Sequence, residues 1–354
     1  MNRLFRRISA AALVVTVAVG GLTACSSSEA SSPNAAKELR LGYFTNLTHA
    51  TALIGVKDGY FKEALGDVAL KTQTFNAGPA AVEALFSNSI DAAYIGPNPA
   101  INAYVKSKGE AVRIIAGATS GGASLVVQPE IKGVEDLKGT TVSSPQLGNT
   151  QDVALRYWLK EQGVDTNVTG SSDVTITPTE NSNSLQLFRD KKIAGAWVPE
   201  PWASRLVLEG GGKVLVDESS QWPDGQFATT HLLVRTKFLE KNPAAVEALL
   251  QGHVKATEWI NANSEQAKND ANAQLEELTT KKLSEKVLDR AWEQLTITEN
   301  PIASTLQVSA DHAFEAGTLR EKADVKGIYD LSILNKILVA QNQKPVSAAG
   351  LGKE

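Results

Sequence analysis

Hydrophobic and polar positions near the start of the chain repeat first with a period of two and then with a helical period, in alternation. Residues 38–44 (Glu-Leu-Arg-Leu-Gly-Tyr-Phe) alternate and predict a strand, as do residues 69–75. A helix is predicted between them at residues 50–61, and a second helix at residues 80–87 precedes the apolar strand 90–95. Strands that alternate with helices over short loops favour a parallel α/β sheet.

The same alternation continues through the rest of the chain. Strands are predicted at residues 111–116 and 125–127, on either side of a stretch of small residues, 117–124, that we expect to be flexible. A strand at residues 140–143 opens a second doubly wound unit, and the apolar spacing of residues 149–162 predicts the helix that follows. The remaining predicted elements are a short helix start at 133–137, a strand at 228–234, and helices at 239–260, 283–295 and 328–341.

Two distant segments of the chain share a sequence pattern, which we call the internal echo. Residues 85–97 and 187–199 share a Leu-Phe pair, an apolar run that ends on an aromatic residue, and a proline, with one extra residue in the second copy. Each copy predicts a helix, a buried strand and a proline-bearing turn that opens another helix. The similarity is either chance between common α/β units or a true repeat. If it is a repeat, the two strand-to-helix junctions could face one another across a cleft.

The N-terminus has the layout of an export signal. Three arginines precede an apolar run at residues 8–20, and the only cysteine of the chain, Cys25, follows in Leu-Thr-Ala-Cys. The apolar run is too short to span a bilayer, which takes roughly 20 residues. Its end resembles a bacterial lipobox, which implies cleavage before Cys25 and diacylglycerol on its sulfur. The alternatives are an ordinary signal peptide with an incidental cysteine, or a single membrane anchor.

The order of the elements predicts two lobes. The chain is expected to leave the first lobe near residue 120, to build the second, and to cross back near residue 225. Two crossings of this kind form a hinge. The expected fold class is α/β, with two doubly wound lobes joined by two crossing strands. The predicted division is a lipoprotein signal peptide at 1–24, a flexible Ser- and Ala-rich tether at 25–37, lobe I at 38–120 plus 225–345, lobe II at 121–224 and a C-terminal tail at 346–354.

Composition limits the classes of function. Removal of residues 1–24 leaves 330 of the 354 residues and changes the net charge from −4 to −7, because this segment carries three arginines and no acid. A mature chain of this length usually forms two domains. Its acidic balance argues against nucleic acid, for which a basic face is needed. It does not exclude a small anion, since backbone N–H groups bind anions without net charge.

Sequence motifs of the common enzyme classes are absent from the chain. It has no Gly-x-Ser-x-Gly, no P-loop, no Gly-x-Gly-x-x-Gly after a strand and no His-Glu-x-x-His. The four histidines have no ligand spacing; we expect His253 and His312 on solvated helix faces and His231 in the core of a strand. No metal or cofactor is therefore expected, and binding is favoured over catalysis.

Strand-to-helix junctions with small or polar residues are abundant instead. Four candidates are residues 46–49, 76–79, 96–99 and 144–150. In doubly wound sheets such junctions gather at the carboxyl edges of the strands, where ligands bind. Free N–H groups at each helix start carry roughly half a positive charge, which suits an oxyanion. For each junction taken singly, the polar residue could equally be a helix cap and nothing more.

The most distinctive string is residues 198–205, Val-Pro-Glu-Pro-Trp-Ala-Ser-Arg. Two prolines flank Glu200, and Trp197 and Trp202 lie on either side. Such a wall could stack against an apolar part of a ligand while Glu200 contacts a polar or cationic end. The alternative is that Glu200 pairs with Arg205 and the tryptophans fill the core.

Three of these motifs together resemble a known family. Residues 45–50 (Thr-Asn-Leu-Thr-His-Ala), residues 76–97 and residues 197–202 are similar to the substrate-binding lipoproteins of ABC importers, in the nitrate, sulfonate and taurine group. The resemblance covers residues 39–341. It implies a type II periplasmic-binding fold that closes on an anion or zwitterion, outside the cytoplasm and held to the membrane by its lipid only. It also implies delivery to a permease powered by an ATPase, with the binding protein acting as a monomer.

The resemblance also implies ligand contacts. They are Thr48, His49, Gly78, Pro79 and Asn98 in the first lobe, Ser120, Gly121, Gln146, Asn149 and Thr150 at the hinge and in the second lobe, and Trp197 and Glu200 along the wall. None of these is basic, so a sulfonate would be held by neutral donors and helix ends.

Other functions remain open on the sequence. A secreted enzyme could use the same cleft with His49 and Glu200 as a titratable pair, and a ligand-sensing lipoprotein could signal to a membrane partner. Pyrimidine-synthesising enzymes of the same superfamily need a histidine beside a cysteine-rich, iron-binding motif. A chain with one cysteine cannot supply that motif.

Overall fold

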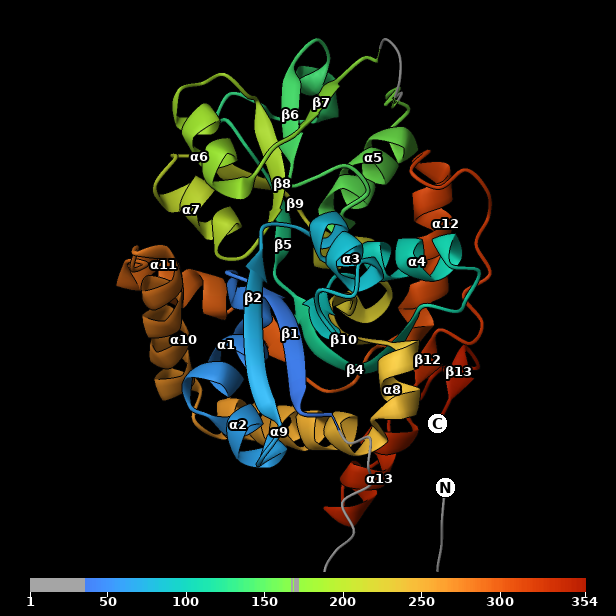
Figure 1. The fold of residues 1–354 in the computed structure, drawn as a ribbon. Coiled ribbons are helices and arrows are strands. Elements are labelled where there is room, and N and C mark those ends of the chain that lie inside the picture. The colour runs from blue at the N-terminus through green and yellow to red at the C-terminus, as the bar shows by residue number, and fades with distance from the viewer. Residues whose placement is uncertain (1–35, 167, 169–171) are drawn as a thin grey trace, which may run out of the picture. The chain divides into compact units, whose positions relative to one another are not determined.

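The computed structural model describes residues 36–166, 168 and 172–354, which form two sheets with helices packed against both (Figure 1). The predicted fold class, α/β with two lobes, is confirmed. Cys25, the signal peptide and nearly all of the tether lie outside the described residues. No helix in the described ranges is long and apolar enough to cross a membrane.

Lobe I begins with alternating strands and helices. The elements are β1 (Glu38–Phe44), η1 (Leu47–His49), α1 (Ala50–Lys57), α2 (Tyr60–Leu65), β2 (Ala69–Phe75), α3 (Gly78–Phe86), β3 (Ala92–Ile95), α4 (Pro97–Lys106) and β4 (Val112–Gly121). Strand β1 pairs in parallel with both β2 and β3. β1 and β2 have the predicted bounds, because their period-two pattern matches the pleat of a strand. The predicted helix 50–61 is divided at Gly59, whose φ of 80° lies in the left-handed region.

Lobe II is an insertion between β4 and a returning strand. Its elements are β5 (Ala123–Val127), η2 (Val134–Leu137), β6 (Thr141–Ser144), α5 (Thr150–Glu161), β7 (Thr175–Pro178), α6 (Asn181–Arg189), β8 (Gly195–Pro199), α7 (Trp202–Leu208) and β9 (Lys213–Asp217). The five strands have the order β7-β6-β8-β5-β9. The expected flexible stretch 117–124 is wrong: β4 continues to Gly121 through its pairing with neighbouring strands, and β5 starts at Ala123.

The chain returns to lobe I and completes an eight-stranded sheet. The elements are η3 (Glu218–Gln221), η4 (Pro223–Gly225), β10 (Ala228–Arg235), α8 (Thr236–Lys241), α9 (Pro243–Ala262), α10 (Ser264–Thr279), α11 (Glu285–Trp292), β11 (Leu295–Ile297), η5 (Ala303–Thr305), α12 (Leu306–Glu315), β12 (Tyr329–Asp330), α13 (Ser332–Ala340) and β13 (Gly352–Lys353). The strand order is β13-β12-β4-β10-β3-β1-β2, with β11 paired to β4.

Two expectations near the C-terminus need correction. The predicted helix 328–341 starts only at Ser332, because Tyr329 pairs with Ile114 of β4. The last residues were expected as a tail, yet Gly352 pairs in parallel with Tyr329 and extends the sheet. Helices α10 and α12 were not predicted.

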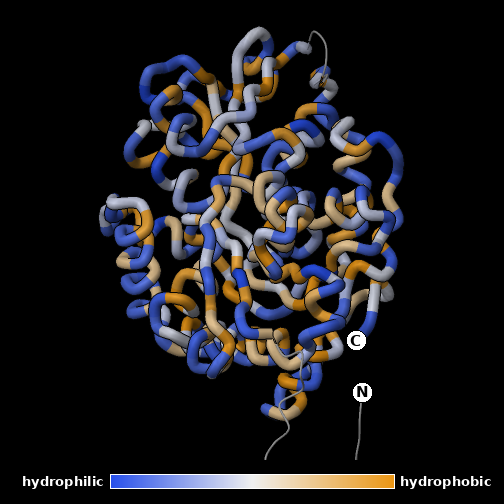
Figure 2. Tube along the Cα trace, viewed as in Figure 1, coloured by the Kyte–Doolittle hydropathy of each residue, from blue (hydrophilic) through white to orange (hydrophobic). Residues whose placement is uncertain are grey.

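The core follows the strand pattern. Alternate residues of β5 enter different clusters: Leu125 and Val127 pack with Trp197 on one face of the sheet, and Val126 packs with Phe188 on the other. Both faces of this sheet are therefore buried, as its mostly apolar strands require. Figure 2 shows the hydrophilic positions mainly along the outer helices and loops of the protein.

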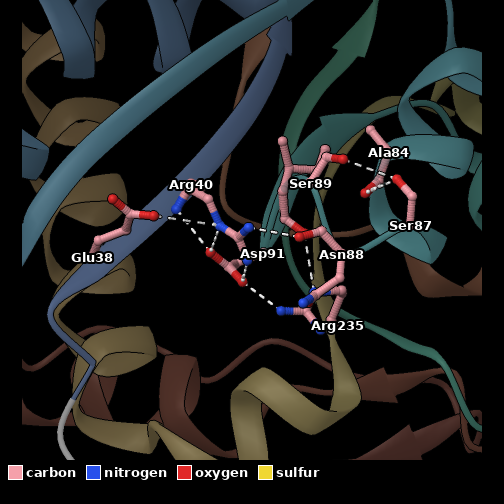
Figure 3. A network of polar contacts seen from close by, with 9 residues as sticks. Glu38, Arg40, Ala84, Ser87, Asn88, Ser89, Asp91 and Arg235 are labelled. Atoms are coloured by element: carbon pink, nitrogen blue, oxygen red, sulfur yellow. Dashed lines mark hydrogen bonds and ion pairs between the residues drawn. The ribbon is translucent and has the colours of Figure 1, made fainter.

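An ion-pair network links the amino-terminal ends of β1 and β3 to the carboxyl-terminal end of the antiparallel strand β10 (Figure 3). The buried Asp91 accepts hydrogen bonds from Arg40 Nε at 2.8 Å and Nη2 at 2.7 Å, and from Arg235 Nη2 at 2.5 Å. Burial alone would raise the pKa of Asp91, but the hydrogen bonds from the two arginines outweigh it and the pKa is lowered. This network leaves the carboxyl ends of β1 and β3 free for other contacts.

Candidate functional site

A polar pocket lies where the carboxyl ends of the strands of the two lobes meet. It has a volume of about 20 Å³, which is room for about one water-sized group. Lobe I and lobe II both contribute to its wall. The residues of this polar pocket are Phe44, Asn46, Thr48, His49, Asn76, Ala77, Gly96, Pro145, Asn149, Thr150, Gln151, Asn181, Pro199 and Thr229.

Four helices begin at the polar pocket. Ala77 and Gly96 are the N-cap residues of α3 and α4 in lobe I, and Thr150 and Asn181 are the first residues of α5 and α6 in lobe II. These helices have 9, 10, 12 and 9 residues. Their first turns have backbone N–H groups outside the helical pattern, except at Pro79 of α3 and at Pro97 and Pro99 of α4, which have no N–H. Their dipoles add positive potential at one point, which favours an anion.

The pocket supplies donors without a cation. No lysine or arginine is among the described residues of its wall. Thr150 is 5% exposed and Asn181 is 8% exposed, and neither Thr150 Oγ1 nor Asn181 Oδ1 has a hydrogen-bond partner among the described residues. A buried polar group without a partner costs about 1–3 kcal/mol. Thr150 Oγ1 can therefore donate to a bound molecule, whereas Asn181 Oδ1 can only accept a hydrogen bond from one.

A buried carboxylate shapes the loop before α5. Asp152 is fully buried and accepts hydrogen bonds from Ser144 Oγ at 2.6 Å, from the Gly148 N–H at 2.9 Å and from Arg156 Nε at 3.1 Å. These three bonds bind the end of β6, the loop and the second turn of α5 to one another. Thr150 is thus held at a fixed place on the pocket wall.

Hydrogen bonds join the lobes around the pocket. The Gly78 N–H donates to Asn149 Oδ1 at 3.1 Å, and Trp202 Nε1 donates to Asn46 Oδ1 at 2.9 Å. Gly78 has no room for a side chain, because an added Cβ would lie 2.2 Å from Pro99 Cγ. The lobes are in contact, so a ligand larger than the pocket enters only when they separate.

His49 is a neutral member of the pocket. The residue is 3% exposed, and its Nδ1 accepts a hydrogen bond from the Phe44 N–H at 3.3 Å. Burial lowers the pKa of His49 to about 3, so the ring is uncharged at neutral pH. A neutral ring that accepts at Nδ1 carries its proton on Nε2, as a donor.

A second hollow, the aromatic cavity, adjoins the polar pocket. The two share Thr150, and the consecutive residues Gly96 and Pro97 line one each. The volume of the aromatic cavity is also about 20 Å³. Its residues are Pro97, Asn98, Thr150, Val153, Ala154, Tyr157, Trp158, Trp197, Glu218, Gln221, Trp222, Phe227, Ala228, Ser309 and His312.

Glu218 places a carboxylate at this cavity. It is 1% exposed and accepts a hydrogen bond from Trp197 Nε1 at 2.7 Å. Burial raises the pKa of Glu218 to about 7, against the opposing effect of the Trp197 bond. Glu218 was not predicted as a site residue, because no sequence motif distinguishes it from the acidic and serine residues around it.

The structure brings some of the expected contacts together and separates others. Thr48, His49, Asn149 and Thr150 line the polar pocket, and Gly78 is bonded to its wall. The other expected residues lie elsewhere. Asn98 and Trp197 line the aromatic cavity, and Pro79 lines an outer groove of about 770 Å³. Ser120 and Gly121 line a hinge-side cleft of about 400 Å³, and the backbone carbonyl of Gln146 accepts a hydrogen bond from the Asn149 N–H at 3.0 Å.

Glu200 needs a correction. It is fully buried and its carboxylate accepts hydrogen bonds from the Ser204 N–H and Oγ, both at 3.0 Å, and from Arg290 Nη1 at 3.4 Å. It therefore holds the first turn of α7 to α11 instead of lining the polar pocket, and it does not form a pair with His49. The alternative partner was also wrong, since Arg205 pairs with Glu209 at 3.2 Å.

Two histidine expectations are wrong as well. His253 is fully buried in α9, where its Nδ1 lies 2.7 Å from Tyr94 Oη, and His312 stacks on Tyr157 with ring centroids 3.6 Å apart. His231 is a core residue of β10, as expected, with Nε2 at 2.9 Å from the Pro301 carbonyl.

The internal echo corresponds to real elements. Its copies are α3–β3–α4 and α6–β8–α7, and both strands are buried along their length. Gly96 after β3 and Pro199 at the end of β8 both line the polar pocket. Asn76 belongs to the predicted junction 76–79, whereas Asn181 and Thr229 were not predicted, because they become neighbours of the other pocket residues only when the lobes meet.

Comparison with known proteins identifies the family. The model of the NMT1-like family matches residues 32–275. The chain belongs to the NMT1-like family. It is 27% identical over 335 residues to the Bacillus subtilis "Putative aliphatic sulfonates-binding protein", which covers 92% of this chain and 96% of that one.

Solved structures share the fold of this NMT1-like protein. The nitrate-binding protein NrtA from Synechocystis PCC 6803 is similar with a TM-score of 0.69 and 18% identity, over 82% of this chain and 84% of that one. The alkanesulfonate-binding protein SsuA from Xanthomonas axonopodis pv. citri, bound to MOPS, is similar with a TM-score of 0.67 and 17% identity, over 82% and 96%. Both of these solved structures are of binding proteins, and their similarity to this chain shows a shared fold.

Proposed function

We propose that the protein is the extracytoplasmic binding component of an ABC importer. It captures a small sulfonate-like oxyanion or zwitterion and delivers it unchanged to a membrane permease. The observation that carries this proposal is the convergence of four helix starts, two from each lobe, on one neutral polar pocket. Relatives named for sulfonates, nitrate and bicarbonate bind ligands of the same charge class.

The oxyanion head group occupies the polar pocket in this proposal. Thr48, His49, Thr150 and Asn181 surround it with neutral polar side chains, and the helix starts supply the positive potential. Because the closed pocket has a volume of only about 20 Å³, binding requires the lobes to part and close again about the crossing strands. In this proposal the chain crosses between the lobes near residues 120 and 225, lobe II is residues 121–224, and Cys25 carries the lipid anchor.

Titration calorimetry of the mature chain with nitrate, methanesulfonate and taurine tests the binding function. We expect at least one of them to bind with one site per chain, and mass spectrometry of the recovered ligand to show it unchanged. Small-angle scattering should show the protein becoming more compact on binding. Failure of all three to bind, or chemical conversion of the one that binds, refutes the proposal.

Two further measurements address the membrane steps. Expression of the full chain in a bacterium should give a membrane-associated protein, and Cys25→Ser should release it into the soluble extracytoplasmic fraction. Uptake of the ligand by the host should depend on the binding protein together with a permease. Equal membrane association of wild type and variant would remove the lipid anchor from the proposal.

A further inference from the structure

The aromatic cavity has a composition that the oxyanion function does not explain. The chain has six tryptophans, and three of them, Trp158, Trp197 and Trp222, line this one cavity. Tyr157 and Phe227 add two more rings. The rings come from α5, β8 and the segment between β9 and β10, so tertiary structure alone assembles them. A group of aromatic rings can bind a cation, because each ring face carries partial negative charge.

The carboxylate of Glu218 points to the same chemistry. Glu218 is 1% exposed, and no lysine or arginine is among the described residues of the cavity wall. Among the described wall residues, the one basic type is a histidine, His312. Its ring is neutral at pH 7, because burial lowers its pKa to about 4. A buried carboxylate normally has a cationic partner, since an unpaired one is costly. The described residues of the cavity wall do not provide that partner.

The size of the cavity selects the kind of cation. A volume of about 20 Å³ holds one water-sized group, as an ammonium is, and is too small for an additional ring. The position of the cavity beside the polar pocket determines how long the rest of the ligand can be. Thr150 is a common wall of the aromatic cavity and the polar pocket, so a short linker is enough to place one group in each.

We propose that the aromatic cavity and Glu218 bind the ammonium end of a short zwitterion whose oxyanion occupies the polar pocket. The inference rests on the proposed function and narrows it to amino-substituted organic oxyanions. Glu218 takes the specificity role that the sequence analysis gave to Glu200. Trp222, which is half-buried beside Phe227 with ring centroids 5.9 Å apart, closes the cavity on the solvent side.

Taurine and isethionate are the matched pair of ligands for the test. They share the sulfonate and the two-carbon linker and differ only in an ammonium or a hydroxyl group. We expect taurine to bind wild type at least about tenfold more tightly than isethionate. Glu218→Gln retains an oxygen for the Trp197 bond and should reduce this ratio to about one, mainly by weakening taurine binding.

Two more variants separate recognition from folding. Trp222→Leu removes a ring from a half-buried position and should lower the taurine-to-isethionate ratio several-fold, which keeps the test valid if Glu218→Gln fails to fold. Glu200→Gln alters an equally buried carboxylate that does not line the cavity, so it should leave the ratio unchanged. A folded Glu218→Gln with the wild-type ratio overturns the inference.

The remaining outcomes distinguish this inference from the proposed function. Equal affinity of wild type for taurine, isethionate and methanesulfonate overturns the inference and leaves oxyanion binding intact. Tighter binding of benzenesulfonate than of taurine, unaffected by Glu218→Gln, assigns the cavity to an apolar ring and also overturns it. No binding of any of these sulfonates or of nitrate overturns the proposed function itself.

Discussion

Thr150→Val removes one hydroxyl group from the polar pocket and should change ligand affinity and protein stability in opposite directions. Thr150 Oγ1 is buried and has no hydrogen-bond partner in the part of the chain that the structure describes. Valine has nearly the same shape but cannot donate or accept a hydrogen bond. The ligand-free protein therefore loses nothing by the change, whereas a bound oxyanion loses a donor.

The magnitudes follow from these contacts. A hydrogen bond to a charged group contributes about 1.5–3 kcal/mol, so the dissociation constant should rise by about 10- to 150-fold. An unsatisfied buried hydroxyl costs about 1–3 kcal/mol, so the free energy of unfolding should stay equal or rise by about 1 kcal/mol. Most substitutions that weaken binding through misfolding would lower that free energy instead.

Calorimetric titration and urea denaturation of the same preparations measure the two effects. The ligand is whichever of nitrate, methanesulfonate and taurine binds wild type most tightly. Thr150→Ser keeps the hydroxyl and should retain most of the affinity. Thr257→Val is the matched control, because Thr257 Oγ1 in α9 is also buried without a partner but lines neither hollow. It should leave affinity unchanged.

Two results would refute this reasoning. Unchanged affinity in Thr150→Val would mean that the hydroxyl does not contact the ligand, and the polar pocket would lose its assigned role. A loss of stability of about 2 kcal/mol or more would mean that the hydroxyl has a partner within the protein.

Three further predictions concern charge and close packing. The pKa of Glu218 is raised from 4.5 to about 7, so between these pH values the folded state binds more protons than the unfolded state. Wild-type stability should therefore fall as pH rises through this range. Glu218→Gln should remove this fall, and in urea denaturation at pH 8 it should be more stable than wild type by about 3 kcal/mol. Asp91 has a lowered pKa, so its contribution is lost in acid as pH falls through that pKa; Asp91→Asn should cost about 3 kcal/mol at pH 7, without a change in ligand affinity by calorimetry. Gly78→Ala should push α3 away from Pro99, costing about 1–3 kcal/mol and weakening binding, whereas Gly133→Ala, whose added Cβ meets nothing within 4 Å, should do neither.

The order of strands and helices could be predicted because it depends on local periodicity. The bounds of β1 and β2 agree with the sequence pattern residue for residue, and the echo of residues 85–97 at 187–199 marked two equivalent strand-to-helix units. Where the prediction was wrong, distant pairing decided the outcome. The small residues after 117 have no local strand signal, and they are extended because β10 and β11 pair with them.

The polar pocket was predicted in part for the same reason. Thr48, Asn149 and Thr150 each follow a recognisable strand, and parallel strands bring such positions to one edge of a sheet. The direction of a side chain is not a local property. Glu200 has the more conspicuous sequence context, between two prolines, yet Ser204 and the distant Arg290 turn its carboxylate away.

The sequence by itself determined the α/β class, the two-lobed order of elements, the family motifs and the candidate lipid site. Only the tertiary structure decided which junctions meet, and it placed Asn181 and Thr229 beside residues far away in the chain. It also selected Glu218 as the carboxylate of the aromatic cavity, in contact with Trp197. The physical reason is that hydrophobic periodicity and turn chemistry act over a few residues, whereas burial and hydrogen-bond partners depend on packing between elements that the sequence keeps apart.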